Sequence, residues 1–144
     1  MRRAALACLL LLAGCATSHD RQDIVFGSAS WPGGAVYGPK ATLIVYLADA
    51  SGPETPIEVD LQKIDNPVPG AELLAYATDE GMMRSPHYFP LPVPAEKVDS
   101  GHDYVLKMVV VDQGHPVLAL TDPPLVLTRG HPRQVDVTLG PVGR

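Results

Sequence analysis

DYVLKMVVVD, residues 103–112, is the segment from which the fold class is best inferred. Between its terminal aspartates both alternating sets of side chains are apolar, apart from Lys107. A short run of this kind, rich in β-branched residues, is typical of a strand buried on both faces. We therefore predict a central strand over residues 103–112, with Leu106, Met108 and Val110 facing the core.

The same pattern of short strands extends outward from this stretch. Residues 117–121 follow it after the turn 112–115, which predicts a hairpin. Apolar runs bounded by turn residues, several of them alternating apolar with polar side chains, predict further strands over residues 23–30, 42–49, 56–63, 87–93 and 134–139. Pro90 and Pro92 lack backbone donors, so we expect the strand 87–93 to lie at a sheet edge.

Seven short strands separated by Gly and Pro clusters predict an all-β domain. The chain has 15 prolines, and no window of a dozen residues carries a helical apolar stripe. We expect an immunoglobulin-like or transthyretin-like β-sandwich, in which two sheets pack face to face. Residues 65–85 are an exception, because this long connection fits either an extra strand or one helical turn. A single helical turn is also expected within residues 94–99.

The N-terminus has the pattern of an export signal. Arg2 and Arg3 precede the uncharged segment 4–13, which has the length of a secretory apolar core and is too short to span a bilayer. The core ends in LAGC, residues 12–15, which resembles a bacterial lipobox. The resemblance implies cleavage before Cys15 and attachment of acyl chains to it. The alternative is an ordinary secretory signal with a chance cysteine.

This reading divides the chain into three parts. Residues 1–14 are expected to be the signal peptide, residues 15–22 a lipidated tether, and residues 23–144 the β-sandwich domain. The lipobox residues that precede the acylated cysteine are Leu12, Ala13 and Gly14.

The residue after Cys15 bears on the destination of the lipoprotein. It is Ala16 and not Asp, which by resemblance to enterobacterial sorting favours the outer membrane, with the domain facing the periplasm. One acyl chain gives only weak, reversible binding, whereas two or three make the attachment lasting.

Charge and cysteine content exclude several classes of function. The formal net charge of −5 becomes more negative when Arg2 and Arg3 leave with the signal, and an acidic domain does not favour nucleic acid. Of the two cysteines, Cys8 would be removed and Cys15 acylated. Neither a disulfide nor a cysteine-based site is therefore expected.

Catalytic chemistry has weak support in the sequence. DSGHD, residues 99–103, holds the residue types of a hydrolase triad, but a triad converges from separate elements. Ser-Gly flanked by Asp is ordinary turn chemistry. The 5 histidines are scattered and form no His-Glu-x-x-His motif. We expect no enzyme, no catalytic residues, no metal and no cofactor.

A partner-binding surface is the remaining candidate site. Tryptophan is enriched at binding hot spots, and flexible methionines suit adaptable surfaces. The candidate residues are Trp31, Leu73, Leu74, Tyr76, Met82 and Met83. The alternative is that these side chains cap the open ends of the core, and the extent of their burial separates the two interpretations.

Six stretches carry a resemblance through their order and spacing. They are GSAS (27–30), ATLIVYLADAS (41–51), SPHYFPLPV (85–93), PAEKV (94–98), LALTD (118–122) and VDVTL (135–139). Together they resemble the YbaY/YscW family of small bacterial lipoproteins over roughly residues 23–142. The chain departs from the family pattern in the long connection 65–85 and in lacking a basic residue shortly after the first strand.

The resemblance implies an immunoglobulin-like sandwich on an outer-membrane lipoprotein. Some members of this family are pilotins, lipoproteins that escort a secretin to the outer membrane. We therefore expect a non-enzymatic protein-binding module, chaperone-like or pilotin-like, with an envelope protein such as a secretin as its client. The alternative is a lipid-anchored binder of small molecules or glycans.

Overall fold

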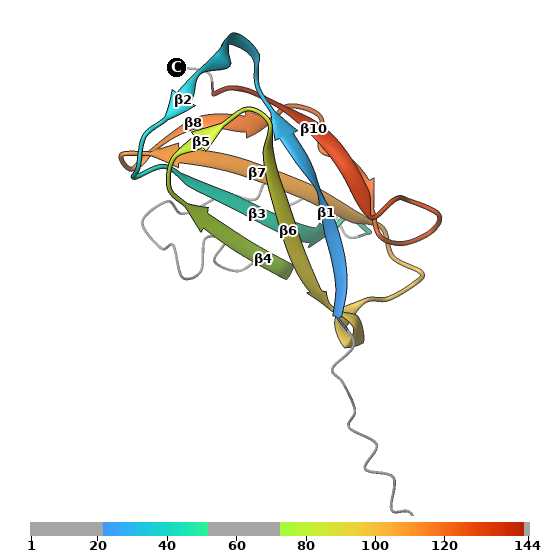
Figure 1. Cartoon of the computed structure of the whole chain (residues 1–144). Coiled ribbons are helices and arrows are strands. Elements are labelled where there is room, and N and C mark those ends of the chain that lie inside the picture. The colour runs from blue at the N-terminus through green and yellow to red at the C-terminus, as the bar shows by residue number, and fades with distance from the viewer. Residues whose placement is uncertain (1–21, 52–72, 143–144) are drawn as a thin grey trace, which may run out of the picture.

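A computed structural model describes residues 22–51 and 73–142 of the chain (Figure 1). Within these ranges the chain is mostly β-structure with two short 3₁₀ turns, η1 (Pro32–Gly34) and η2 (Ala95–Lys97). The predictions of a mostly β domain and of a turn within residues 94–99 are confirmed. No helix in the described ranges is long and apolar enough to cross a bilayer. The lipobox, Cys15 and the predicted strand 56–63 lie outside the described residues.

Six predicted strands are present with small shifts at their ends, and β4 and β5 lie in the connection 65–85. The described strands are β1 (Gln22–Ser30), β2 (Val36–Tyr37), β3 (Thr42–Asp49), β4 (Leu73–Glu80), β5 (Met83–Arg84), β6 (His87–Pro94), β7 (Tyr104–Asp112), β8 (His115–Leu120), β9 (Leu125–Val126) and β10 (Gln134–Pro141). The extra strand in the connection is therefore the correct alternative of the two that the sequence allowed.

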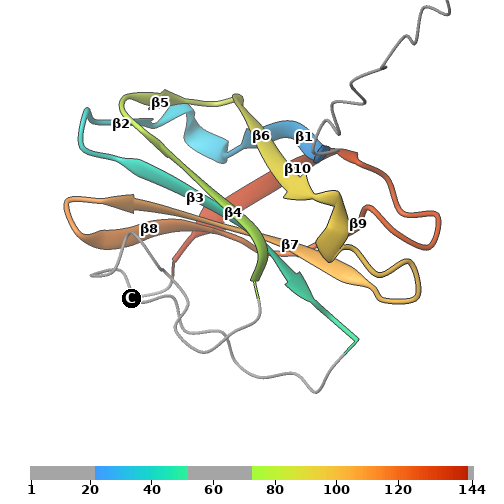
Figure 2. The same cartoon turned by 90° about the horizontal axis from the view of Figure 1, so that it is seen from below.

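The main strands follow one hydrogen-bonded path, β4-β3-β7-β8-β10-β1-β6, with β9 paired to β7 and a small separate pair of β2 and β5. β10 joins the two parts of the path, because its first half runs parallel to β1 and its second half antiparallel to β8. The sheet therefore curls into a nearly closed barrel (Figure 2). The all-β class is therefore confirmed, with most strands on one curled path, whereas the immunoglobulin-like arrangement of two packed sheets stays a prediction.

β7 is central, as predicted. It pairs with β3 on one side and with β8 and β9 on the other. Leu106, Met108 and Val110 face the main core, which also contains Leu43, Leu47, Met83, Leu91, Val126 and Leu139. Val109 and Val111 are buried on the opposite face with Ile44 and Tyr46 of β3. Burial on both faces is the reason that neither alternating set of β7 is polar.

Prolines leave the barrel open between its terminal strands. Pro90, Pro92 and Pro94 occupy alternate positions of β6 and have no N–H to donate. Because alternate residues of a strand bond to opposite neighbours, the N–H groups of Phe89 and Leu91 serve the ladder with β1. The side of β6 that faces away from β1 therefore lacks donors, and the predicted edge position is confirmed.

β4 and β6 nevertheless run close together without a ladder, and we call this gap in the hydrogen bonding the seam. A side-chain contact bridges it, with His87 Nε2 of β6 lying 2.8 Å from Asp79 Oδ2 of β4. The seam is thus held by side chains in place of backbone hydrogen bonds.

The parallel contact between β1 and β10 depends on Gly27. A Cβ placed on this residue would lie 1.6 Å from the carbonyl oxygen of its partner Val135. This distance is far below van der Waals contact, so no side chain fits at this position. The glycine therefore lets the first and last strands of the domain lie side by side.

Candidate functional site

The outer face of β1 and β6 exposes apolar and aromatic side chains. Tyr88 is 74% exposed, Ile24 46% and Phe26 43%. The register places Phe26 beside Pro90 and Ile24 beside Pro92, with Tyr88 across from Ser28. We call the surface formed by Ile24, Phe26, Tyr88, Pro90 and Pro92 the aromatic face.

The aromatic face arises because β1 and β6 are apolar on both sides. Val25, Phe89 and Leu91 occupy the alternate positions and are buried in the core. The residues between them are therefore directed outward, and their exposed fractions mean that nothing described in the chain covers them. Exposed aromatic groups gathered on one surface are typical of an interaction site.

A shallow hollow of about 300 Å³ lies within this surface. Phe26, Tyr88 and Pro90 supply its apolar lining, and Gln134 and Asp136 of β10 form a polar rim. Asp136 Oδ1 accepts hydrogen bonds from the Ser28 hydroxyl at 2.7 Å and from the Ser28 N–H at 3.2 Å. An apolar hollow on an exposed face can receive an apolar side chain of a protein partner.

The structure separates the six residues singled out as a partner-binding surface. Trp31, Leu74 and Met83 belong to the core, Leu73 is partly buried, and Tyr76 and Met82 are exposed. Core packing, the alternative considered for these side chains, therefore describes Trp31, Leu74 and Met83.

Trp31 is fixed in the core by two contacts. Its Nε1–H donates to the Ala35 carbonyl at 2.8 Å, and its ring meets the edge of Tyr37 with centroids 5.8 Å apart. These two side-chain contacts are local to the loop after β1, and the Trp31 N–H also donates to the Ser85 hydroxyl at 3.0 Å, so its position depends on that loop and on residue 85.

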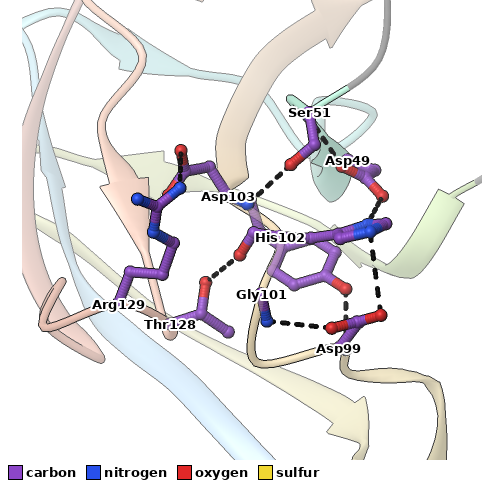
Figure 3. A network of polar contacts seen from close by, with 9 residues as sticks. Asp49, Ser51, Asp99, Gly101, His102, Asp103, Thr128 and Arg129 are labelled. Atoms are coloured by element: carbon purple, nitrogen blue, oxygen red, sulfur yellow. Dashed lines mark hydrogen bonds and ion pairs between the residues drawn. The ribbon is translucent and has the colours of Figure 1, made fainter.

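A second candidate site is a polar network before β7, drawn in Figure 3. His102 lies between two carboxylates, with Nδ1 2.6 Å from Asp49 Oδ2 and Nε2 3.7 Å from Asp99 Oδ2. Ser51 accepts a hydrogen bond from the Asp103 N–H at 2.8 Å through its hydroxyl. The network joins the end of β3 to the start of β7.

The contact between His102 and Asp49 shifts both pKa values. The hydrogen bond and the charge of Asp49 raise the pKa of His102 above its ordinary value of 6.5, and the charge of Asp99 adds to this. Partial burial raises the pKa of Asp49, but hydrogen bonds from the Ser51 N–H and from His102 outweigh it and leave that pKa below 3.8. The pair is thus stabilised in its charged form.

The network does not form a hydrolase triad. Both ring nitrogens of His102 face carboxylates, whereas catalysis by a serine requires a hydroxyl at one of them. In residues 22–51 and 73–142 no group of three or more His, Cys, Asp or Glu side chains is arranged to hold a metal ion. The described part of the network therefore braces the end of β3 against the start of β7.

Sequence reasoning did not find the aromatic face. A signal was present, since Ile24 and Phe26 share one side of the first predicted strand. Period-two alternation assigns residues to a common side but does not say which side faces water when both are apolar.

Comparison with known proteins gives two findings. The family described as type III secretion system lipoprotein chaperone (YscW) matches residues 20–139 of this chain. The structure of an alternative pilotin from the type II secretion system of Vibrio cholerae is similar to it, with a TM-score of 0.70 and 19% sequence identity, covering 86% of this chain and 100% of that chain. At this identity the likeness concerns the fold. No curated protein matches the sequence significantly.

Proposed function

Because this chain belongs to the YscW family of type III secretion lipoprotein chaperones, we propose that it is a lipid-anchored, pilotin-like chaperone of the cell envelope with a secretin-like client. The anchor is a set of acyl chains on Cys15, which the LAGC motif at residues 12–15 supports. The domain then lies on the periplasmic side of the outer membrane, and its role is non-enzymatic.

The observation that carries this proposal is the aromatic face. A chaperone requires a surface that is stable in water and whose coverage by an apolar segment lowers the free energy of the system. Tyr88, Ile24 and Phe26 provide such a surface on a rigid pair of strands. Fully burying a large apolar side chain contributes about 1.5–3 kcal/mol, and a few such anchors carry most of the binding free energy of a typical interface.

The client binds on this face and not by adding a strand to the edge of β6. Strand addition needs backbone donors and acceptors along the edge. The prolines of β6 leave its open side without donors at three positions. Contacts between side chains therefore dominate recognition, and the acyl chains carry the complex to the membrane.

Site-specific photo-crosslinking in the native envelope tests the proposal. A photoreactive p-benzoylphenylalanine replaces Tyr88 on the aromatic face, Tyr76 on β4, or Gln113 in the turn between β7 and β8. We expect position 88 to give a discrete adduct that mass spectrometry identifies as a secretin, and position 113 to give none. An adduct from position 76 alone would move the client to the surface of β4. The absence of a secretin adduct from both 88 and 76 would refute the proposal.

A matched pair of variants separates binding from folding. Phe26→Asp places a charge on the aromatic face, and Val36→Asp places one on β2, where the side chain is similarly exposed at 52%. Because both side chains are already in contact with water, each change should alter the free energy of unfolding by less than about 1 kcal/mol. Only Phe26→Asp should abolish the secretin adduct.

A further inference from the structure

A hollow of about 430 Å³ lies beside the start of β1, at the end of the domain where the chain enters it. Arg129 and Arg133 line it together with Asp23, Ser100 and the apolar side chains Val98 and Leu127. The hollow is distinct from the aromatic face, with which it shares no lining residue.

The two guanidinium groups are only partly used by the protein. Arg133 Nη1 donates to Asp23 Oδ1 at 2.9 Å, and Arg129 Nη1 donates to Asp103 Oδ2 at 3.4 Å. Both side chains are more than half exposed, at 52% and 57%. A guanidinium has five N–H donors in a planar fork that matches a phosphate group. Further donors therefore remain available to an anion in the hollow.

The backbone of the loop that carries Arg129 is strained. Leu127 has a φ of 77° and Arg129 a φ of 54°, and neither is glycine. A left-handed residue of this kind costs on the order of 1 kcal/mol and often lies at a binding site. Thr128 holds the loop in place, because its hydroxyl donates to the His102 carbonyl (Figure 3). The strained conformation of this loop thus places the Arg129 guanidinium beside the hollow.

The position of the hollow places it within reach of a membrane. β1 begins at Gln22, and the adjacent Asp23 lines the hollow. Six residues lie between Cys15 and Gln22, and the seven residue-to-residue steps that join them span at most about 25 Å when extended. A domain held by acyl chains on Cys15 can therefore bring this end to the headgroup layer.

We propose that this hollow binds a singly charged phosphate diester and that the membrane supplies it as a phospholipid headgroup. Arg129 and Arg133 donate to the phosphate oxygens, and Val98 and Leu127 contact the adjoining carbon chain. Asp23 and Asp103 offset part of the positive charge, so a monoanion is preferred to the dianion of inorganic phosphate. The anchored domain then has β1 directed away from the membrane surface. The aromatic face points parallel to that surface, toward a client.

Amide hydrogen exchange on the full acylated protein tests this inference. In phosphate-free detergent micelles the probe is glycerophosphoethanolamine, with inorganic phosphate for comparison. In a second arm the protein is bound to vesicles of phosphatidylethanolamine or of a phosphate-free galactolipid. At a ligand concentration of ten times Kd, exchange of the amides between residues 127 and 133 should slow about tenfold. Phosphatidylethanolamine vesicles should give the same protection and galactolipid vesicles none.

Charge-removing variants complete the test. Arg129→Gln and the double variant Arg129→Gln/Arg133→Gln should lose the protection. Lys97→Gln removes a charge at the same end of the domain without lining the hollow, and it should keep the protection. If the double variant does not fold, the comparison of Arg129→Gln with the wild-type titration shows whether the protection depends on Arg129.

The outcomes are separable from those for the client. If the soluble diester protects these amides and phosphatidylethanolamine vesicles do not, the hollow is a phosphate site but a membrane headgroup is not its ligand. No protection in either arm, or protection that survives in Arg129→Gln, overturns the inference. Failure of the acylated protein to float with galactolipid vesicles would contradict the lipid anchor and leave the titration in micelles unaffected.

Discussion

At the scale of single residues, Gly27 is a position on β1 where the backbone of β10 leaves no room for a side chain. Gly27→Ala should destabilise the domain by about 3 kcal/mol or more, because its Cβ would overlap the Val135 carbonyl and only backbone movement can relieve the clash. Chemical denaturation measures this change in the free energy of unfolding.

Gly38→Ala is the control for that substitution. A Cβ at Gly38 meets no atom within 4 Å, and we expect a change of less than about 0.5 kcal/mol. Equal effects of the two substitutions would show that β1 does not need a glycine for its contact with β10.

The pair of His102 and Asp49 should make stability depend on pH. The raised pKa of His102 contributes stability that is fully present below pH 6.5 and is lost as the pH rises through the folded-state value. The lowered pKa of Asp49 contributes stability that is present above pH 3.8 and is lost as the pH falls through its folded-state value. His102→Gln should therefore destabilise the protein more at pH 5 than at pH 9, as measured by urea denaturation.

A double-mutant cycle isolates the same pair. Asp49→Asn combined with His102→Gln should cost less at pH 5 than the sum of the two single variants, because either change alone already breaks the contact. Additive losses at that pH would mean that the two side chains act independently.

At the scale of elements, the prolines of β6 control what its edge can pair with. Pro90→Thr/Pro92→Thr returns two backbone N–H groups to the side that faces away from β1. An edge with donors is a template for pairing with another chain. We expect concentration-dependent dimers in analytical ultracentrifugation.

Pro123→Thr, an exposed position between β8 and β9, is the control for this change and should stay monomeric. If the β6 variant also stays monomeric, β4 and the contact between His87 and Asp79 already shield the edge.

Most long strands could be predicted because their signal is local. The apolar runs 42–49 and 103–112, the alternation in residues 134–139 and the prolines of 87–93 each require only neighbouring residues. β2, β5 and β9 have two residues each and exist through their partners, so no local pattern reveals them. The curl of the sheet was not predicted for the same reason, since it follows from the pairing of β10 with both β1 and β8.

The sites were harder to predict than the strands. Asp49 and His102 are 53 positions apart, and only the pairing of β3 with β7 brings them together. Among the candidate binding residues, Leu74 and Met83 are apolar because they fill the core, and a sequence does not distinguish this from apolarity for binding. Exposure of Phe26 and Tyr88 depends on which side of β1 and β6 the rest of the chain covers.

At the scale of the whole molecule, the proposed anchor governs where the protein resides. Cys15→Ser should move the protein from the membrane fraction to the soluble fraction, because each buried methylene of an acyl chain contributes about 0.8 kcal/mol to membrane binding. Fractionation with immunoblotting measures this. Cys8→Ser changes the other cysteine and should leave the protein in the membrane. Membrane association that survives in Cys15→Ser would contradict acylation at that residue.

The position of β1 also determines how the domain responds to mechanical tension. A pull transmitted through the N-terminal tether acts along β1, which is bonded to β6 on one side and to β10 on the other. These hydrogen bonds lie across the strand direction, so the pull shears all of them together and does not open them one after another. A cargo that drags on the protein would therefore meet its greatest resistance at the strand where the tether begins.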